Sequence, residues 1–119
     1  MSVYRDNHAT DEELKSAASI LVDNRRKKDA SFGLMGVLML AADDVKALMG
    51  EDFSPYCIYD TSRDTRPSHA DVFQRAHGVD ETIRQDRRQK LFASINSGFV
   101  TIAGFRSGLL MPWKAANAP

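Results

Sequence analysis

The segment from Asp60 to Asp71 holds most of the side chains in this sequence that can do chemistry. Its two arginines, Arg63 and Arg66, can bind a phosphate through paired N–H donors. His69 can act as a general acid or base near neutral pH, and Asp60 or Asp64 is a carboxylate that could orient it. Read as a catalytic site, these residue types predict a metal-independent ribonuclease-like or toxin-like enzyme that acts on phosphodiesters.

The same segment also has a plain structural interpretation. Aspartate, serine, threonine and proline are the usual residues of turns and helix N-caps, so their density here needs no catalytic role. Arg63 and Arg66 can each pair with a nearby aspartate. His69, at the predicted start of a helix, suits a neutral hydrogen-bonding role. A third interpretation is an anion-binding surface built on the two arginines, and the sequence leaves all three open.

The motif Arg-Pro-Ser-His at residues 66–69 resembles a short motif of the phage Mu F-type minor head proteins. The glycine that this family places a few residues after the histidine is absent, because residues 71–74 read Asp-Val-Phe-Gln. The resemblance is limited to residues 64–69, and we do not assign the family on it.

A second set of basic residues lies on one predicted helix, at Arg84, Arg87, Arg88 and Lys90. A solvated helix face explains this set, because Asp80 and Arg84 are spaced for an i, i+4 ion pair. The alternative is a nucleic-acid-binding module, in which these residues and the arginines of the first segment bind one phosphate-rich ligand. Both sets together are the predicted anion- or partner-binding residues.

The sequence predicts no cofactor and no metal site. His69 and His77 are eight residues apart and cannot share one ion on a helix, and HExxH, CxxC and Gly-rich phosphate-binding sequences are absent. Cys57 is the single cysteine, so no intramolecular disulfide can form, and its apolar neighbours favour simple packing.

Length and composition are those of one ordinary globular domain: 119 residues, of which 43% are hydrophobic and 27% charged. Sixteen basic and sixteen acidic residues cancel, which gives no argument for binding DNA or a membrane surface. The balance is uneven, because residues 31–60 carry one basic and five acidic groups, whereas residues 61–119 carry nine and five. The two regions can neutralise each other, or the second can present a basic face to an anionic partner. We expect no membrane segment and a cytoplasmic location.

Periodicity and capping residues predict helices at residues 10–28, 31–42, 44–50, 68–77 and 80–96. Thr10 and Glu13 form a capping box for the first helix. The run from Ser31 to Ala42 is apolar on every side, which predicts a central buried helix. Ser68 and Asp71 have the spacing of a second capping box, which places a helix start just before His69.

Two strands are predicted, Tyr56–Tyr59 and Phe99–Phe105, and we expect them to pair. The predicted fold is therefore a single α+β domain that is mostly helical, with four or five helices and a small two- or three-stranded sheet. We expect a loose N-terminus at residues 1–9, a globular domain at 10–111 and a flexible C-terminal tail at 112–119.

These observations favour a small bacterial or mobile-element accessory protein, inside the cell, that acts by binding another macromolecule. A protein partner is preferred, and the phosphodiester-cleaving enzyme and the nucleic-acid-binding module are the two alternatives. The size, the free cysteine and the lack of a cofactor signature agree with such a role.

Overall fold

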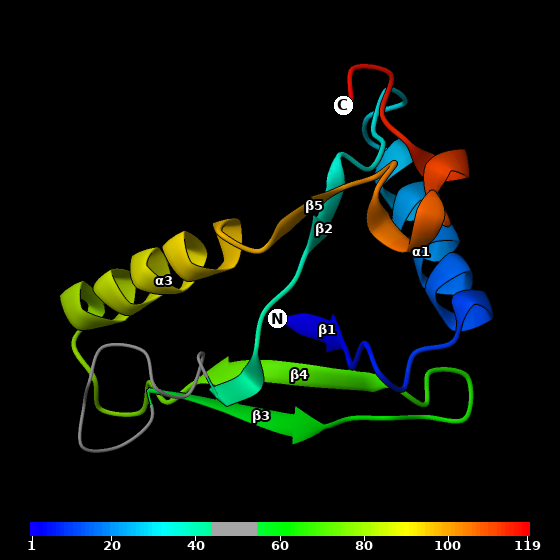
Figure 1. Ribbon diagram of the computed structural model, residues 1–119. Coiled ribbons are helices and arrows are strands. Elements are labelled where there is room, and N and C mark those ends of the chain that lie inside the picture. The colour runs from blue at the N-terminus through cyan, green and yellow to red at the C-terminus, as the bar shows by residue number, and fades with distance from the viewer. Residues whose placement is uncertain (44–54) are drawn as a thin grey trace. The chain divides into compact units, whose positions relative to one another are not determined.

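A computed structural model describes residues 1–43 and 55–119 of the chain. These residues form two compact units, and each is drawn in Figure 1. Unit 1 comprises residues 1–7 and 39–98, and unit 2 comprises residues 8–38 and 99–119. The chain therefore enters each unit twice, so that neither unit is a continuous stretch of sequence.

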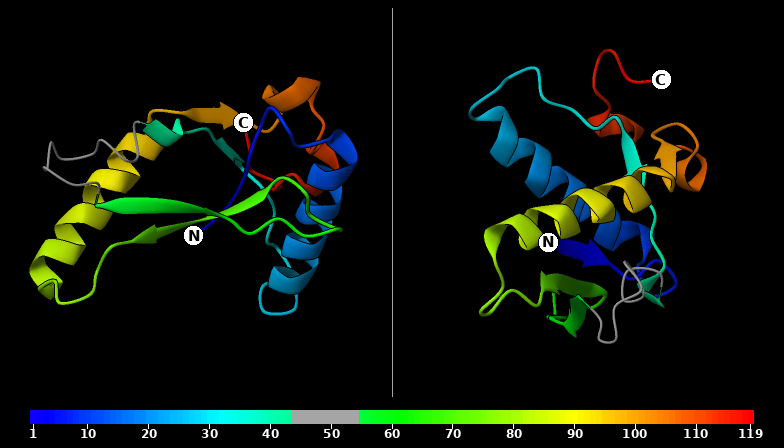
Figure 2. Two further views of the ribbon diagram at one scale, coloured as in Figure 1. Left: turned by 90° about the horizontal axis from the view of Figure 1, so that it is seen from below. Right: turned by 90° about the vertical axis from the view of Figure 1, so that its left-hand side faces the viewer.

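Unit 1 contains a three-stranded antiparallel sheet in the order β1-β4-β3. Its strands are β1 (Ser2–Tyr4), β3 (Tyr56–Asp60) and β4 (His69–Gln74). The central strand β4 pairs Ala70 with Val3 on one side and with Asp60 on the other. Figure 2 shows the β3–β4 ribbon as twisted, which is usual for paired strands.

The two faces of this sheet differ because successive side chains of a strand point to opposite sides. On one face Tyr56 and Val72 are buried and form a core cluster with two residues of helix α3 (Glu81–Asn96), Leu91 and Ile95. Asp80 is the N-cap residue of that helix. The opposite face carries the odd-numbered residues of β3 and β4, among them Tyr59, and it includes the candidate site described below.

Unit 2 is built on helix α1 (Asp11–Arg26), which buries Ala18 and Val22. A two-stranded antiparallel sheet pairs β2 (Gly36–Leu38) with β5 (Phe99–Thr101). Two short 3-10 helices follow, η2 (Phe105–Ser107) and η3 (Met111–Trp113). Leu34 then pairs with the segment after η3, because its N–H donates to the Trp113 carbonyl and its carbonyl accepts from Ala115.

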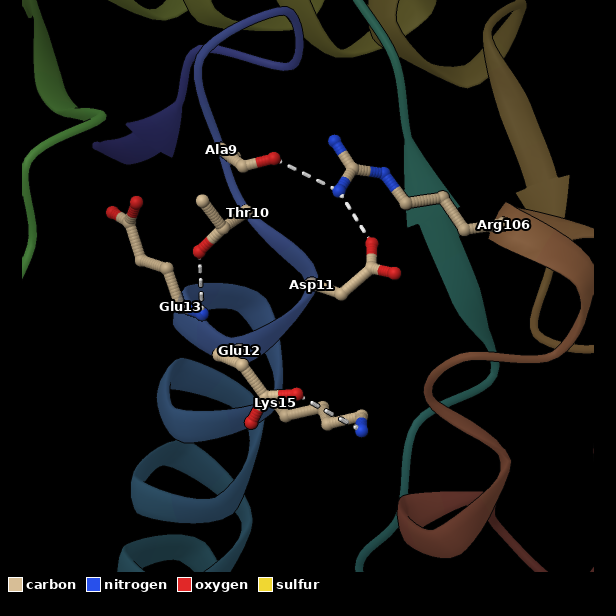
Figure 3. Close-up of polar contacts among 7 residues, drawn as sticks. All are labelled: Ala9, Thr10, Asp11, Glu12, Glu13, Lys15 and Arg106. Atoms are coloured by element: carbon tan, nitrogen blue, oxygen red, sulfur yellow. Dashed lines mark hydrogen bonds and ion pairs between the residues drawn. The ribbon is translucent and has the colours of Figure 1, made fainter.

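The start of α1 is held by a contact within its first turn and by contacts from Arg106, as Figure 3 shows. The Thr10 hydroxyl accepts a hydrogen bond from the backbone N–H of Glu13, which caps the helix as the sequence predicts. The Arg106 guanidinium donates to the Ala9 carbonyl and to the Asp11 carboxylate, both at 2.9 Å. Arg106 makes these contacts from a left-handed backbone conformation (φ 44°), which an L-residue adopts only when other contacts impose it.

The predicted mostly helical domain with four or five helices is wrong. Over residues 1–43 and 55–119 the structure has two α-helices and five strands in two small sheets. The helices predicted at 10–28 and 80–96 are confirmed as α1 and α3, and the strand Tyr56–Tyr59 is confirmed as part of β3. The short helix predicted at 44–50 lies outside the described residues.

The predicted buried helix from Ser31 to Ala42 is instead an extended segment that contains β2. A side chain at Gly33 would approach the backbone of Ala115 to 2.6 Å, and one at Gly36 would overlap the Phe99 ring. Both glycines therefore allow close pairing of extended chains. An entirely apolar run has no periodicity that separates a buried strand from a buried helix.

Two further predictions of secondary structure are corrected. The segment from Ser68 that was expected to be helical is the central strand β4, in which buried Ala70 and Val72 alternate with more exposed residues. The strand predicted at Phe99–Phe105 ends at Thr101, and it pairs with β2, not with β3. Ser2–Tyr4, within the predicted loose N-terminus, forms strand β1.

Candidate functional site

The loop between β3 and β4 closes on itself as a small hairpin at Arg63 and Arg66. The two residues exchange backbone hydrogen bonds, Arg63 N–H to Arg66 carbonyl at 3.1 Å and Arg66 N–H to Arg63 carbonyl at 2.9 Å. Asp64 and Thr65 form the turn between them. Residues that face each other in this way on an antiparallel pair project their side chains to the same side.

The hairpin therefore sets two like charges side by side. Opposed like charges destabilise a strand pair unless an anion lies between or beside them. Within residues 1–43 and 55–119, neither guanidinium makes a hydrogen bond or ion pair, so the local pairing with aspartates considered from the sequence does not occur. Asp60 instead accepts from the Ser62 N–H and pairs with Arg5 at 3.5 Å. The hydrogen bonds from Ser62 are the first cause of the lowered pKa of Asp60.

Arg5 connects this loop to the end of strand β1. Its guanidinium donates to the Pro67 carbonyl at 2.8 Å, and its backbone N–H donates to the Ser68 carbonyl at 2.9 Å. Ser68 is fully buried. These contacts hold the backbone at the base of the loop in place. The hairpin that carries the two arginines is therefore restrained where it joins the sheet.

His69 begins strand β4 and lies beside a threonine and an aspartate. Its Nδ1 is 2.8 Å from the Thr61 hydroxyl and 4.0 Å from the Asp71 carboxylate, and its side chain is 12% exposed. The Tyr4 ring and the imidazole form a T-shaped pair with a centroid distance of 5.3 Å. A hydrogen bond from Thr61 is the first cause of the lowered pKa of Asp71, and Ser2 adds a second.

These contacts favour one tautomer of the neutral imidazole. The carboxylate of Asp71 only accepts, so a hydrogen bond between Thr61 and Asp71 uses the single proton of the Thr61 hydroxyl. The same hydroxyl oxygen then accepts from His69, which requires the proton on Nδ1. The lone pair of His69 is consequently on Nε2, the nitrogen that a proton-accepting role would need.

The predicted basic set on α3 is engaged by neighbouring groups. Arg84 and Arg88 both pair with Glu81, at 2.6 Å and 2.9 Å, and Lys90 pairs with Asp86 at 3.1 Å. Arg88 is the first cause of the lowered pKa of Glu81. Arg87 is only 3% exposed and donates to the Arg75 carbonyl at 2.9 Å. The set thus consists of three side chains paired within the helix and one that is buried.

The face of the sheet that carries His69 also carries two exposed rings, which the sequence reading did not select. Tyr59 and Phe73 lie on neighbouring strands with ring centroids 5.7 Å apart. Period-2 alternation would have found them once Tyr56–Asp60 and His69–Gln74 were paired, because Tyr59 then shares a face with Phe73. The helix predicted at residues 68–77 hid this pattern.

In the part of the chain that the structure describes, no three metal-binding side chains of the His, Cys, Asp or Glu type lie together. None of its helices combines the length and apolar character needed to cross a membrane. Comparison of the whole chain with protein-family models, with curated proteins and with solved structures finds no match.

Proposed function

We propose that this protein acts by binding an anionic macromolecule, whose charged groups are received by Arg63 and Arg66. The observation that carries the proposal is the opposed arginine pair on the hairpin, which has no carboxylate partner among residues 1–43 and 55–119. A phosphate or carboxylate that accepts from both guanidinium groups would remove the repulsion between them. The accessory role inside the cell, in a bacterium or a mobile element, is part of the same proposal.

The rigid base of the loop supports a binding role. Arg5 holds the loop by its side chain and its backbone, so little chain entropy is lost when a ligand engages the hairpin. The α3 arginines are poorer candidates because a single carboxylate, Glu81, already bonds both Arg84 and Arg88. They are therefore a natural control for the hairpin.

The test compares two variants that remove the same number of positive charges. Arg63→Ala with Arg66→Ala should weaken binding of the protein to a polyanion by about tenfold or more, since charge-assisted hydrogen bonds contribute about 1.5–3 kcal/mol each. Arg84→Ala with Arg88→Ala should change it less than about twofold. Fluorescence anisotropy with labelled single-stranded RNA, polyphosphate and polyglutamate measures both. Equal losses in the two variants, or no binding of any polyanion by the wild-type protein, would refute the proposal.

A second candidate function is favoured by the Asp71–Thr61–His69 contacts. A neutral His69 with its lone pair on Nε2 can take the proton of a ribose 2′-hydroxyl while that oxygen attacks the adjacent phosphorus. The new P–O2′ bond forms as the P–O5′ bond breaks, and the 5′-oxygen takes a proton from water. The hydroxide that remains takes the proton from His69, which restores water and the neutral imidazole. The products would be a 2′,3′-cyclic phosphate and a 5′-hydroxyl, with no metal or cofactor required.

Substitution of His69 and substitution of Thr61 should slow such a reaction by different amounts. His69→Ala should lower the cleavage rate of single-stranded RNA by about 100-fold or more, as loss of a general base does. Thr61→Val keeps the shape but removes the hydroxyl, so it should lower the rate less and move the pH–rate profile. The exposed His8→Ala is the control and should leave the rate unchanged. Intact RNA after incubation with wild-type protein and a chelator would eliminate this second candidate.

A further inference from the structure

Two large rings lie together on the solvent-facing side of the sheet in unit 1. Tyr59 is 55% exposed and Phe73 is 48% exposed, and their planes are tilted by 56°. Large exposed apolar side chains are ordinary when scattered, but a contiguous pair on one face is typical of a binding surface. On the opposite face of the same strands, Tyr56 and Val72 are buried in the core. The strands that carry the two rings are therefore held in place by packing.

A hollow of about 500 Å³ adjoins the rings. Besides Tyr59 and Phe73, its walls include the Cys57 thiol and the exposed side chains of Arg75 and His77. This volume is in the range of sites that take small planar ligands. The walls thus combine aromatic faces with a permanent cation, the two kinds of group that a nucleotide engages through its base and its phosphate.

Cationic groups stand at both ends of the aromatic pair. Arg75 follows directly after β4 and lines the same hollow as Phe73. At the other end, Tyr59 is followed along the chain by Thr61 and then by the hairpin that contains Arg63 and Arg66. In the described ranges the Arg75 guanidinium, like those of the hairpin, makes no hydrogen bond or ion pair. Asp71, the carboxylate on this face, is already bonded by Thr61 and Ser2.

Tyr59 itself adds no negative charge to this face. A hydrogen bond with the Cys57 thiol is the first cause of a raised pKa of Tyr59, and the charge of Arg75 opposes it. The phenol therefore stays neutral at physiological pH, and its ring can stack without repelling a phosphate.

We propose that this face binds single-stranded nucleic acid, with one base stacked on Tyr59, a neighbouring base on Phe73, and the backbone phosphates at Arg75 and at the hairpin arginines. This inference rests on the proposed function, because it names the anionic macromolecule. An acidic protein segment would use the arginines but offers no planar groups for the two rings. A duplex keeps its base faces stacked on one another, so it cannot present them to the sheet.

The experiment separates stacking from charge with a labelled single-stranded RNA oligomer and an abasic oligomer of the same length. Tyr59→Ala and Phe73→Ala should each weaken RNA binding by about 5- to 100-fold, the usual range for loss of one stacked base. Tyr59→Phe should bind like the wild type, since the ring remains. Phe92→Ala removes a ring that is 57% exposed on α3 and should have no effect. Thermal unfolding of each variant confirms that it is folded.

The salt dependence of RNA binding and the affinity for the abasic oligomer distinguish base stacking from phosphate contacts. The aromatic variants should keep the wild-type salt slope, whereas Arg63→Ala with Arg66→Ala should flatten it. The abasic oligomer should bind weakly to the wild type, and Tyr59→Ala should weaken it no further. If the hairpin variant loses RNA binding while both aromatic variants keep it, the stacking inference is overturned and the proposed function stands. If the aromatic variants lose binding and the hairpin variant keeps it, the proposed function fails, and so does the placement of phosphates at the hairpin, while stacking on the two rings is supported.

Discussion

Gly98→Ala should destabilise unit 1 by about 2–4 kcal/mol. Gly98 lies two residues after the end of α3. In the structure a Cβ at this position would overlap the carbonyl oxygen of Met39, while the Met39 N–H donates to the Gly98 carbonyl at 2.9 Å. The backbone of Met39 would have to move, and that hydrogen bond with it. Urea unfolding followed by far-ultraviolet circular dichroism measures the loss.

Gly78→Ala is the matched control because it replaces a glycine that is required for a different reason. Gly78 has φ +70° and no atom within 4 Å of the Cβ position. Its substitution should cost only the left-handed backbone strain of about 1–2 kcal/mol. Hydrogen exchange should also localise the Gly98→Ala effect to the amides of α3 and β4. Equal costs for the two substitutions would show that the space at Gly98 is not limiting.

The elements with strong local signals were predictable from the sequence. Helix α1 has a capping threonine and acidic residues in its first turn, and α3 has Asp80 at its N-cap position. Strand β3 is a short run of aromatic and β-branched character that follows Pro55. In each case the local preference agrees with the tertiary environment, so no long-range contact is needed to decide the outcome.

The wrong predictions concern elements whose conformation depends on pairing with a distant strand. Residues 36–38 are extended because they pair with residues 99–101, more than sixty positions away. Strand β4 overrides an apparent capping box at Ser68 because β1 and β3 pair with it on both sides. Such long-range pairing leaves no trace in a local window, and a fortuitous capping pattern is then the stronger local signal.

The candidate site divides in the same way. The sequence selected Arg63, Arg66 and His69 by residue type, and the structure places all three around one loop. Their surroundings were not predictable, because Asp60 pairs with Arg5 just after β1 and not with a hairpin arginine, and Thr61 reaches His69 only through the β3–β4 pairing. Composition identifies which groups can act, and topology decides which of them meet.

Arg87→Ala should also have a large effect, with a cost of about 2–4 kcal/mol in unit 1. The side chain is 3% exposed and donates to the Arg75 carbonyl at 2.9 Å. Its truncation removes the packing of the alkyl stem and leaves a carbonyl without its donor, and both losses destabilise the folded state. The free energy of unfolding in urea measures the cost directly.

The neighbouring Arg88→Ala supplies the comparison, because it removes the same charge from an exposed position. Its ion pair with Glu81 lies at the surface, so the expected change is below about 0.5 kcal/mol. Arg87→Met separates the two contributions of Arg87, since it keeps most of the apolar stem and loses only the donor. We expect it to fall between the wild type and Arg87→Ala. If Arg87→Ala and Arg88→Ala proved equally mild, Arg87 would have to be exposed in solution, and the basic set predicted on α3 would regain it as a binding residue.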